Sequence, residues 1–389
     1  MISYQVQEFG KPLAQVLRET PSPEGSEVLL RVDGCGLCHS DLHLHDGYFD
    51  LGDGKRIDLA RGLKLPRTLG HEIVGTVVAL GPDAAGVGVG DRRVVYPWIG
   101  CGTCAVCAAG QEHLCGAPRG LGTQADGGFA DHVRVPHARY LFDYTGLPPE
   151  QACTLACAGV TAYSALRKAA PMGAADRLLI IGAGGVGLSA VRMARQMFGM
   201  APLVAELDRS KWDLAREAGA GECFDPTEPT AVKAVTTASG GGAAAAIDFV
   251  GAGSSFAFGL ATVRKAGHLI CVGLFGGSTP VSPALLALRA VRISGSYVGS
   301  LQEMQEVMTL AQAGHLAPLP LATRPLAQAN EALADQGRPR AWPHDSRSLI
   351  VTLSKASPCI PPSASTSTAS SSTAAAAKSR TCSTRPPTR

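Results

Sequence analysis

Four cysteines fall within one short run, CGTCAVCAAGQEHLC, with the spacing C-x2-C-x2-C-x7-C. Thiolates this close together can fill all four positions around one Zn²⁺ ion, which is the pattern of a structural zinc site. An iron–sulfur cluster also takes four cysteines and is the chemical alternative. The candidate ligands are Cys101, Cys104, Cys107 and Cys115.

A second, incomplete set of metal ligands lies on both sides of this run. Cys38 occurs in GLCHSDLH, His71 in GHEIVG and Cys157 in CAGVTAY. Two thiolates and one imidazole make a three-ligand zinc site with one position left for water or substrate. Such an ion acts as a Lewis acid, which lowers the pKa of a bound alcohol and polarises a carbonyl in the reverse direction.

A glycine-rich loop, IGAGGVG, ends an apolar run and opens an amphipathic segment. In the pattern G-x-G-x-x-G, Gly182 permits a tight turn, Gly184 lets the backbone approach a pyrophosphate, and Gly187 lets helix and strand pack closely. Gly185 and Val186 complete the loop, and the N-terminus of the helix that follows faces the phosphates.

An acidic residue stands where this loop needs one. Glu206 lies 19 residues after Gly187, at the end of PLVAEL. A carboxylate there binds the adenosine ribose hydroxyls and repels a 2′-phosphate, so NAD is favoured over NADP. Asp208 competes for the same role, and Arg209 argues for NADP because an arginine beside this site can hold a 2′-phosphate.

One closed metal site, one open metal site and one dinucleotide loop, in this order, resemble the zinc-dependent alcohol dehydrogenases of the medium-chain dehydrogenase/reductase family. The motifs that carry the resemblance are GLCHSDLH, GHEIVGTV, the four-cysteine run, GGFADHV, CAGVTAYSAL and GAGGVG. The resemblance implies an α/β protein with a GroES-like β-rich catalytic domain and a Rossmann cofactor domain with a doubly wound parallel sheet. It also implies an enzyme that interconverts an alcohol and an aldehyde or ketone by hydride transfer to or from NAD.

The resemblance assigns further roles around the open metal site. Ser40 takes the alcohol proton, and His43, with an ordinary pKa of about 6.5, receives it. Asp41 accepts the second ring N–H of His71 and holds the ligating tautomer. Glu72 lies close to the metal, as an exchanging ligand or beside the ligand shell.

The resemblance also implies contacts to the cofactor. His39 approaches the pyrophosphate, Thr161 touches the nicotinamide, and Lys211 lies on the adenine side. Val272 and Val298 line the carboxamide pocket through backbone groups.

The predicted elements fit two kinds of domain. Residues 26–33, 72–79 and 91–96 alternate as strands of an all-β domain, and 147–170 indicate a helix that links two domains. From about residue 176 strands and helices alternate, which favours a parallel sheet. The predicted domains are 1–150 (catalytic, with the zinc lobe at about 97–118), 151–300 (Rossmann), 301–353 (an atypical return to the catalytic domain, with SLIVTL as its strand) and 354–389 (a disordered Ser/Thr/Ala/Pro tail).

One departure from compact relatives lies between the first two ligands. Cys38 and His71 are 33 residues apart, and the insert at 44–67 accounts for the extra length. Two placements are open for this insert. Either it borders the substrate cleft, where Tyr48, Phe49 and Leu51 would shape specificity, or it lies on the surface or at a subunit contact.

Composition narrows the partners. No long apolar stretch predicts a membrane span, and the N-terminus does not have the pattern of a signal peptide. Twelve cysteines without an export signal indicate thiols and metal in a cytoplasmic protein. The net charge is +3, of which +6 comes from residues 346–389, so the rest of the chain carries −3 and does not predict a nucleic-acid partner.

The expected partners are therefore a small alcohol, aldehyde or ketone and further copies of the chain, as a homodimer or homotetramer. A non-catalytic dinucleotide-binding relative is the alternative from another class of protein. A family member impaired by an altered C-terminus is a third interpretation.

Overall fold

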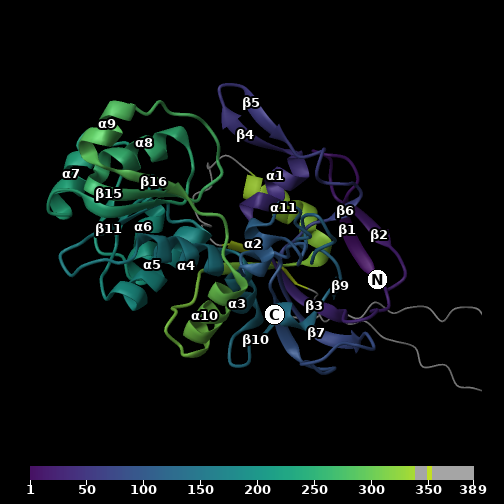
Figure 1. The fold of residues 1–389 in the computed structure, drawn as a ribbon. Coiled ribbons are helices and arrows are strands. Elements are labelled where there is room, and N and C mark those ends of the chain that lie inside the picture. The colour runs from purple at the N-terminus through teal and green to yellow at the C-terminus, as the bar shows by residue number, and fades with distance from the viewer. Residues whose placement is uncertain (338–347, 353–389) are drawn as a thin grey trace, which may run out of the picture. The chain divides into compact units, whose positions relative to one another are not determined.

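The computed structural model of the protein describes residues 1–337 and 348–352 (Figure 1). The tail predicted at 354–389 lies outside the described residues. No helix within the described ranges is long and apolar enough to cross a membrane.

A mixed sheet built around β3 carries the first two candidate metal ligands. Its strand order is β10-β8-β7-β3-β18-β17, and β9 also pairs with β3. Its strands are β3 (Val28–Leu37), β7 (Glu72–Leu80), β8 (Arg92–Val95), β9 (His132–Val135), β10 (Leu141–Asp143), β17 (Leu321–Pro325) and β18 (Ser348–Thr352). The three strands predicted in this region correspond to β3, β7 and β8.

The register of this sheet places two ligands side by side. β3 and β7 are antiparallel, with Gly36 opposite Glu72. Cys38 follows the last residue of β3, and His71 precedes the first residue of β7. Because the end of one strand lies beside the start of its antiparallel neighbour, ligands 33 positions apart in sequence meet at one edge.

The last described strand returns to this sheet. β18 pairs antiparallel with β3 over Gly34–Leu37 and parallel with β17. It lies within SLIVTL, the segment for which a strand was expected. β17 and α11 (Ala329–Gly337) were not predicted.

Smaller elements lie around the mixed sheet built on β3. They are β1 (Ile2–Val6), β2 (Ala14–Leu17), β6 (Arg67–Thr68), α1 (His39–Asp46), α2 (Ala105–Ala108) and the hairpin of β4 (Tyr48–Gly52) and β5 (Lys55–Asp58). The hairpin occupies the insert of the sequence.

The expectation of one helix over 147–170 is wrong. The segment forms α3 (Pro149–Cys153), a 3-10 turn (Thr154–Ala156) and α4 (Ala158–Ala169). The break falls on Cys157, whose backbone has φ −127° and ψ −74°, outside helical geometry. The helical pattern of the sequence is therefore interrupted at the residue whose thiol lies with Cys38 and His71.

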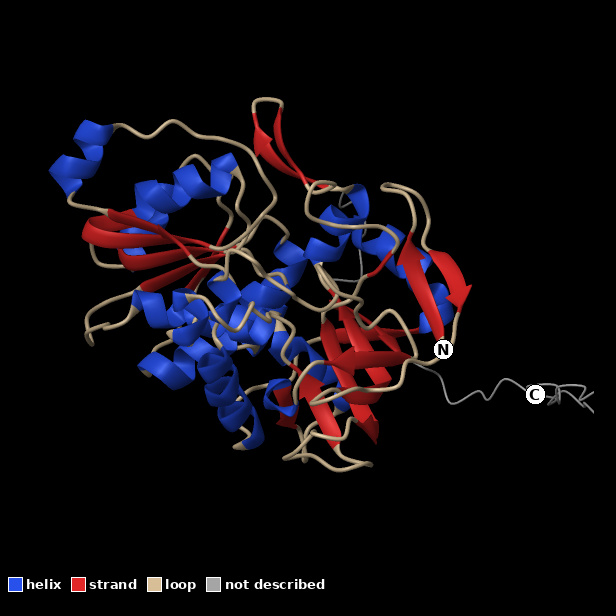
Figure 2. Cartoon of the chain, turned by 45° about the vertical axis from the view of Figure 1, so that its right-hand side comes forward, coloured by secondary structure: helices blue, strands red, loops and turns tan. Residues whose placement is uncertain are grey.

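A parallel sheet follows, with helices on both faces (Figure 2). Its order is β13-β12-β11-β14-β15-β16, the strand order of the doubly wound dinucleotide-binding fold. The strands are β11 (Leu178–Ile181), β12 (Leu203–Ala205), β13 (Cys223–Phe224), β14 (Ala243–Asp248), β15 (Val263–Cys271) and β16 (Arg292–Gly295). Its helices are α5 (Gly185–Phe198), α6 (Trp212–Glu217), α7 (Ala231–Ala238), α8 (Gly253–Thr262) and α9 (Pro283–Arg289).

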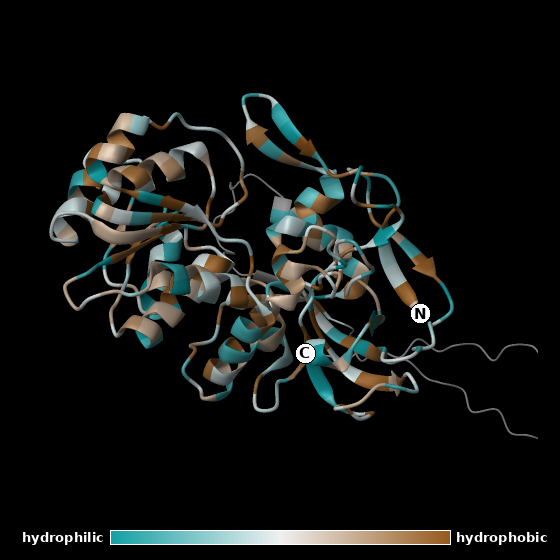
Figure 3. Cartoon of the chain, in the orientation of Figure 1, coloured by the Kyte–Doolittle hydropathy of each residue, from teal (hydrophilic) through white to brown (hydrophobic). Residues whose placement is uncertain are grey.

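The helix α10 (Leu301–Gln312) shows why these segments fold as they do. Its buried residues recur at helical spacing: Met304, Val307, Met308 and Ala311. Polar residues are interspersed with them along the helix (Figure 3). Ser300 and Glu303 form a capping box at its start, as the sequence S-x-x-E predicts.

Candidate active site

The four cysteines of the zinc lobe lie at the separations that one metal ion requires. The Sγ–Sγ distance is 3.9 Å for Cys101–Cys107, 3.5 Å for Cys104–Cys107 and 3.8 Å for Cys104–Cys115. Four sulfurs tetrahedrally placed at the Zn–S bond length lie about 3.8 Å apart. These distances are too long for disulfides, and they fit a single ion better than an iron–sulfur cluster, whose irons spread the cysteine sulfurs apart.

A buried carboxylate supports the lobe. Glu112 accepts hydrogen bonds from the hydroxyl of Tyr140 at 2.7 Å and from the backbone N–H of Gly100 at 3.3 Å, and it forms an ion pair with Arg139 at 2.9 Å. Because Gly100 precedes Cys101, this network links the four-cysteine run to the mixed sheet built around β3.

The open site brings together Cys38, His71 and Cys157. Their ligand atoms all lie within 4.8 Å of one another, and the two thiols are 3.9 Å apart. His71 is fully buried, and its Nε2 has no conventional hydrogen-bond partner among the described residues. Two sulfurs at the spacing of a tetrahedral zinc shell, with a buried imidazole beside them, fit the expected ion.

Asp41 orients two of these ligands at once. One carboxylate oxygen accepts the backbone N–H of Cys38 at 2.9 Å and caps α1. The other accepts the N–H of Gly70 at 3.1 Å and lies 3.4 Å from Nδ1 of His71. The structure therefore places Asp41 where it can hold the His71 tautomer that leaves Nε2 to the metal.

Glu72 lies behind the ligands with its side chain buried. Burial, reinforced by the negative charge of Cys38, raises the pKa of Glu72 to about 8. Its carboxylate fills the space beside Gly36, where an added Cβ would lie 1.9 Å from Oε2. It also accepts the N–H of Ala158 at 3.4 Å.

The residues expected to move the proton lie on α1, directly after Cys38. Ser40 and His43 are in its first and second turns. The His43 ring lies 4.8 Å from the Phe49 ring of the hairpin, and burial lowers the pKa of His43. The His39 ring stacks at 4.5 Å on Phe275, in the loop after β15.

The glycine loop has the geometry that each glycine was expected to provide. Gly182 adopts φ +92°, and an added Cβ on Gly187 would lie 1.9 Å from the Gly182 carbonyl oxygen. An added Cβ on Gly184 would meet nothing within 4 Å. A tight turn, a close helix–strand contact and free space beside the backbone are the requirements of a pyrophosphate loop.

Glu206 faces this loop. Its carboxylate accepts the N–H of Ala183 at 2.7 Å and the N–H of Asp208 at 3.0 Å. Asp208 instead caps the following 3-10 turn by accepting from Ser210. Arg209 forms ion pairs with Asp225 and Glu228.

The remaining expected cofactor residues lie at the carboxyl ends of the parallel strands or on α4. Thr161 is buried, and its hydroxyl has no hydrogen-bond partner among the described residues. Val272 follows β15, and Val298 follows β16 with φ +38°. Lys211 is buried, with its ammonium 4.0 Å from Asp208.

The insert contacts the loop that follows β15. Ser278 donates a hydrogen bond to Asp53 at 2.6 Å, and an added Cβ on Gly52 would lie 2.5 Å from the backbone of Gly277. Two members of the predicted trio approach His43, Phe49 through its ring and Tyr48 through a backbone hydrogen bond. The Tyr48 ring stacks with Arg56, and Leu51 is 45% exposed.

This contact gives a prediction with a control in the same turn. G52A is expected to release the hairpin, because the new methyl group collides with backbone atoms of residues 277 and 278. G54A imposes the same left-handed strain, with φ +74° against +81°, but has nothing within 4 Å. Amide hydrogen exchange at 48–58 should accelerate in G52A and change little in G54A; equal exchange in both would contradict the contact.

Two aromatic residues near the open site were missed by sequence reasoning. The Trp98 ring lies 5.2 Å from the His71 ring and 6.0 Å from the Tyr297 ring. The only sequence signal was the position of Trp98 between a predicted strand and the cysteine run.

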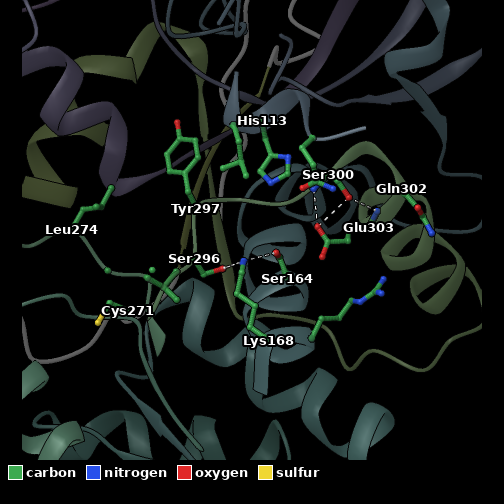
Figure 4. Close-up of a pocket in the computed structure, with 16 residues that line it drawn as sticks. His113, Ser164, Lys168, Cys271, Leu274, Ser296, Tyr297, Ser300, Gln302 and Glu303 are labelled. Carbon is green, nitrogen blue, oxygen red and sulfur yellow. Dashed lines mark hydrogen bonds between the residues drawn. The ribbon is translucent and has the colours of Figure 1, made fainter. Parts of the chain in front are cut away.

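A cavity of about 650 Å³ is lined in part by Tyr297 (Figure 4). Lys168 donates hydrogen bonds there to Ser296 at 2.8 Å and to Ser164 at 3.2 Å. None of the residues that line the cavity is a metal ligand candidate. Val272, one of the expected cofactor residues, does line it.

Comparison with known proteins decides the family. Residues 24–144 match the alcohol dehydrogenase GroES-like domain, and 185–313 match the zinc-binding dehydrogenase domain. An NAD-dependent alcohol dehydrogenase of Sulfurisphaera tokodaii is 36% identical over 335 residues, which cover 86% of this chain and 95% of the relative. The chain belongs to the zinc-dependent alcohol dehydrogenases.

Two further relatives show how far this alcohol dehydrogenase family extends. The solved alcohol dehydrogenase of Aeropyrum pernix superposes with a TM-score of 0.79 at 29% identity, covering 90% of this chain and all of that one. A D-arabinose 1-dehydrogenase (NADP⁺) of Saccharolobus solfataricus is 31% identical, covering 86% of this chain and 94% of the relative. Membership confirms the predicted fold, reaction class, and zinc and nicotinamide cofactors, but family likeness alone does not distinguish NAD from NADP.

Proposed function

We propose that this alcohol dehydrogenase uses NAD, with Cys38, His71 and Cys157 holding the catalytic zinc. The observation that carries the proposal is the cluster of two thiols and a buried imidazole, with their ligand atoms within 4.8 Å of one another. The same chain carries a glycine loop with the geometry of a pyrophosphate site. A non-catalytic relative would have no need of the three-ligand set and the adjoining Ser40 and His43.

The residues around the cluster have separate tasks in this proposal. When bound, zinc supplies a Lewis acid and the nicotinamide supplies the hydride acceptor or donor. Ser40 accepts the alcohol proton and passes it toward His43, and Asp41 holds His71 in place. Glu72 serves as a nearby exchanging ligand. Cys101, Cys104, Cys107 and Cys115 hold a second zinc that stabilises the lobe.

The cofactor preference rests on Glu206 and Arg209. Glu206 is bonded to the glycine loop, so its carboxylate can bind ribose hydroxyls and repel a 2′-phosphate. Arg209 is engaged by two carboxylates, which favours NAD by neutralising the one cation that argued for NADP. His39, Thr161, Lys211, Val272 and Val298 complete the proposed cofactor site.

E206Q is expected to raise the KM for NAD⁺ roughly 10- to 100-fold, the effect of losing a hydrogen bond to a charged group. E206Q should also reduce the preference for NAD⁺ over NADP⁺, because the charge that repels the 2′-phosphate is removed. Steady-state kinetics with both cofactors measures this. In D208N the preference should persist; a reversal of the two results would assign the ribose to Asp208.

H43Q is expected to lower kcat for alcohol oxidation about 100-fold, because the amide cannot accept a proton. Burial lowers the pKa of His43, whereas Asp46 and Cys38 act to raise it. The ring therefore stays neutral down to below pH 6.5, and the acid limb of the wild-type kcat profile should lie below that pH. H45Q, on the same helix, should keep the wild-type profile; an unchanged profile in H43Q would remove His43 from the relay.

The wider assignments follow the same reasoning. Residues 1–150, together with 301–337 and 348–352, form the catalytic domain, and 151–300 form the cofactor domain. The enzyme works in the cytoplasm as a homodimer or homotetramer on a small alcohol, aldehyde or ketone. Exposed Leu285 and Leu288 lie on α9, the helix that precedes the outermost strand β16, and support assembly through the cofactor domain. Light scattering after gel filtration measures the oligomeric state.

The decisive test combines metal analysis with turnover. About two zinc ions per chain, together with NAD⁺ reduction by members of a panel of primary, secondary and benzylic alcohols, would support the proposal. Cofactor binding without turnover in zinc-loaded protein would favour the non-catalytic alternative.

A further inference from the structure

Trp98 joins the open metal site to the segment that carries its third ligand. Its indole Nε1–H donates a buried hydrogen bond to the carbonyl of Ala156 at 2.9 Å. Ala156 is fully buried and immediately precedes Cys157, where the backbone leaves helical geometry. The bond therefore fixes the peptide plane from which the Cys157 thiol projects.

The ring of the same indole contacts a second candidate ligand. The ring lies 5.2 Å from the ring of His71, at an angle of 56°. Trp98 is 8% exposed and belongs to the loop between β8 and Cys101. One rigid side chain thus contacts an imidazole ligand with its ring and the backbone beside a thiolate ligand with its N–H.

We propose that Trp98 is a positioning residue for the catalytic metal, which sets the direction of the Cys157 thiolate relative to His71. The proposal rests on the assignment of the open site under the proposed function. Metal ligands are usually oriented by hydrogen bonds from polar groups outside the ligand shell. Trp98 would orient His71 by ring contact and Cys157 through the hydrogen-bonded carbonyl of Ala156. A carbonyl left buried without its donor would rotate to find another, and the thiolate would move with it.

The experiment is to replace Trp98 by phenylalanine and to load the open site with Co²⁺, whose visible bands report ligand geometry. W98F keeps an apolar ring but loses the N–H. We expect altered cobalt bands and release of zinc from the open site to a chelating dye roughly 10- to 100-fold faster. The lobe zinc, identified in a C157S variant, should be released as in the wild type.

W212F is the matched control, because Trp212 also donates its indole N–H to a backbone carbonyl, that of Glu206, at 3.0 Å. The same chemical change at the cofactor side should leave the cobalt bands and zinc release unchanged. If W98F itself loses its fold by circular dichroism, benzothienylalanine at position 98 removes only the N–H.

Wild-type cobalt bands and zinc release in a folded Trp98 variant would overturn the proposal, even if turnover fell, because the ring would then act only as a wall of the substrate site. Wild-type protein that binds cobalt but oxidises no alcohol would count against the proposed function alone. The metal measurements do not depend on turnover.

Discussion

The C157S variant is expected to lose alcohol oxidation by about 1,000-fold or more and to retain about one zinc ion per chain. In the proposed open site Cys157 supplies one of three ligands, and a neutral hydroxyl is a much poorer ligand than a thiolate. The remaining zinc belongs to the four-cysteine lobe. Metal analysis and steady-state kinetics on the same preparation check both parts.

Cys153 offers a control four residues earlier in the chain. It is also fully buried, but its thiol donates to the Glu150 carbonyl and lies outside both ligand clusters. A serine at that position can make the same hydrogen bond, so C153S should retain both zinc ions and most of the activity. Equal losses in both variants would mean that Cys157 acts through folding rather than through ligation.

The C104S variant is expected to lower the unfolding midpoint by on the order of 10 °C, because loss of a structural metal is among the largest single-residue effects on stability. The Sγ atom of Cys104 lies 3.5 Å from that of Cys107 and 3.8 Å from that of Cys115, so its removal opens the tetrahedron. Thermal unfolding followed by circular dichroism, with zinc content measured in parallel, tests this expectation.

Val106 lies between two of these ligands and is 38% exposed. V106S changes the same loop without touching the metal, and its midpoint should stay near that of the wild type. A C104S protein that unfolded at the wild-type temperature with one zinc fewer would show that the lobe contributes little to stability. The cysteines would then have another use.

The candidate metal ligands, which the structure brings into two clusters, could be picked out from the sequence because each belongs to a short local pattern. The four-cysteine run needs only its own spacing, and the glycine loop is recognisable by the apolar strand before it. Cys38 and His71 are farther apart, but each adjoins a strand, and the antiparallel pairing of β3 and β7 brings them together.

What the sequence did not predict depends on contacts between distant segments. Trp98 lies in a loop, and its neighbours His71 and Ala156 come from other segments of the chain. The break at Cys157 was hidden because its immediate neighbours, Ala156 and Ala158, favour helix. The insert could not be placed, because its position rests on glycine backbones at residues 52 and 277 that meet only in three dimensions.

The pairing of β18 with β3 has a consequence for the order of synthesis. Gly34–Leu37, the stretch that leads into Cys38, receives one of its two neighbouring strands from residues 348–352. A ribosome adds about 5–20 residues each second, so Cys38 emerges roughly 15–60 s before that strand exists. Until residues 348–352 are made, the strand that leads into Cys38 lacks its β18 neighbour. The catalytic centre of this enzyme is thus among the first parts of the chain to be made and among the last to be finished.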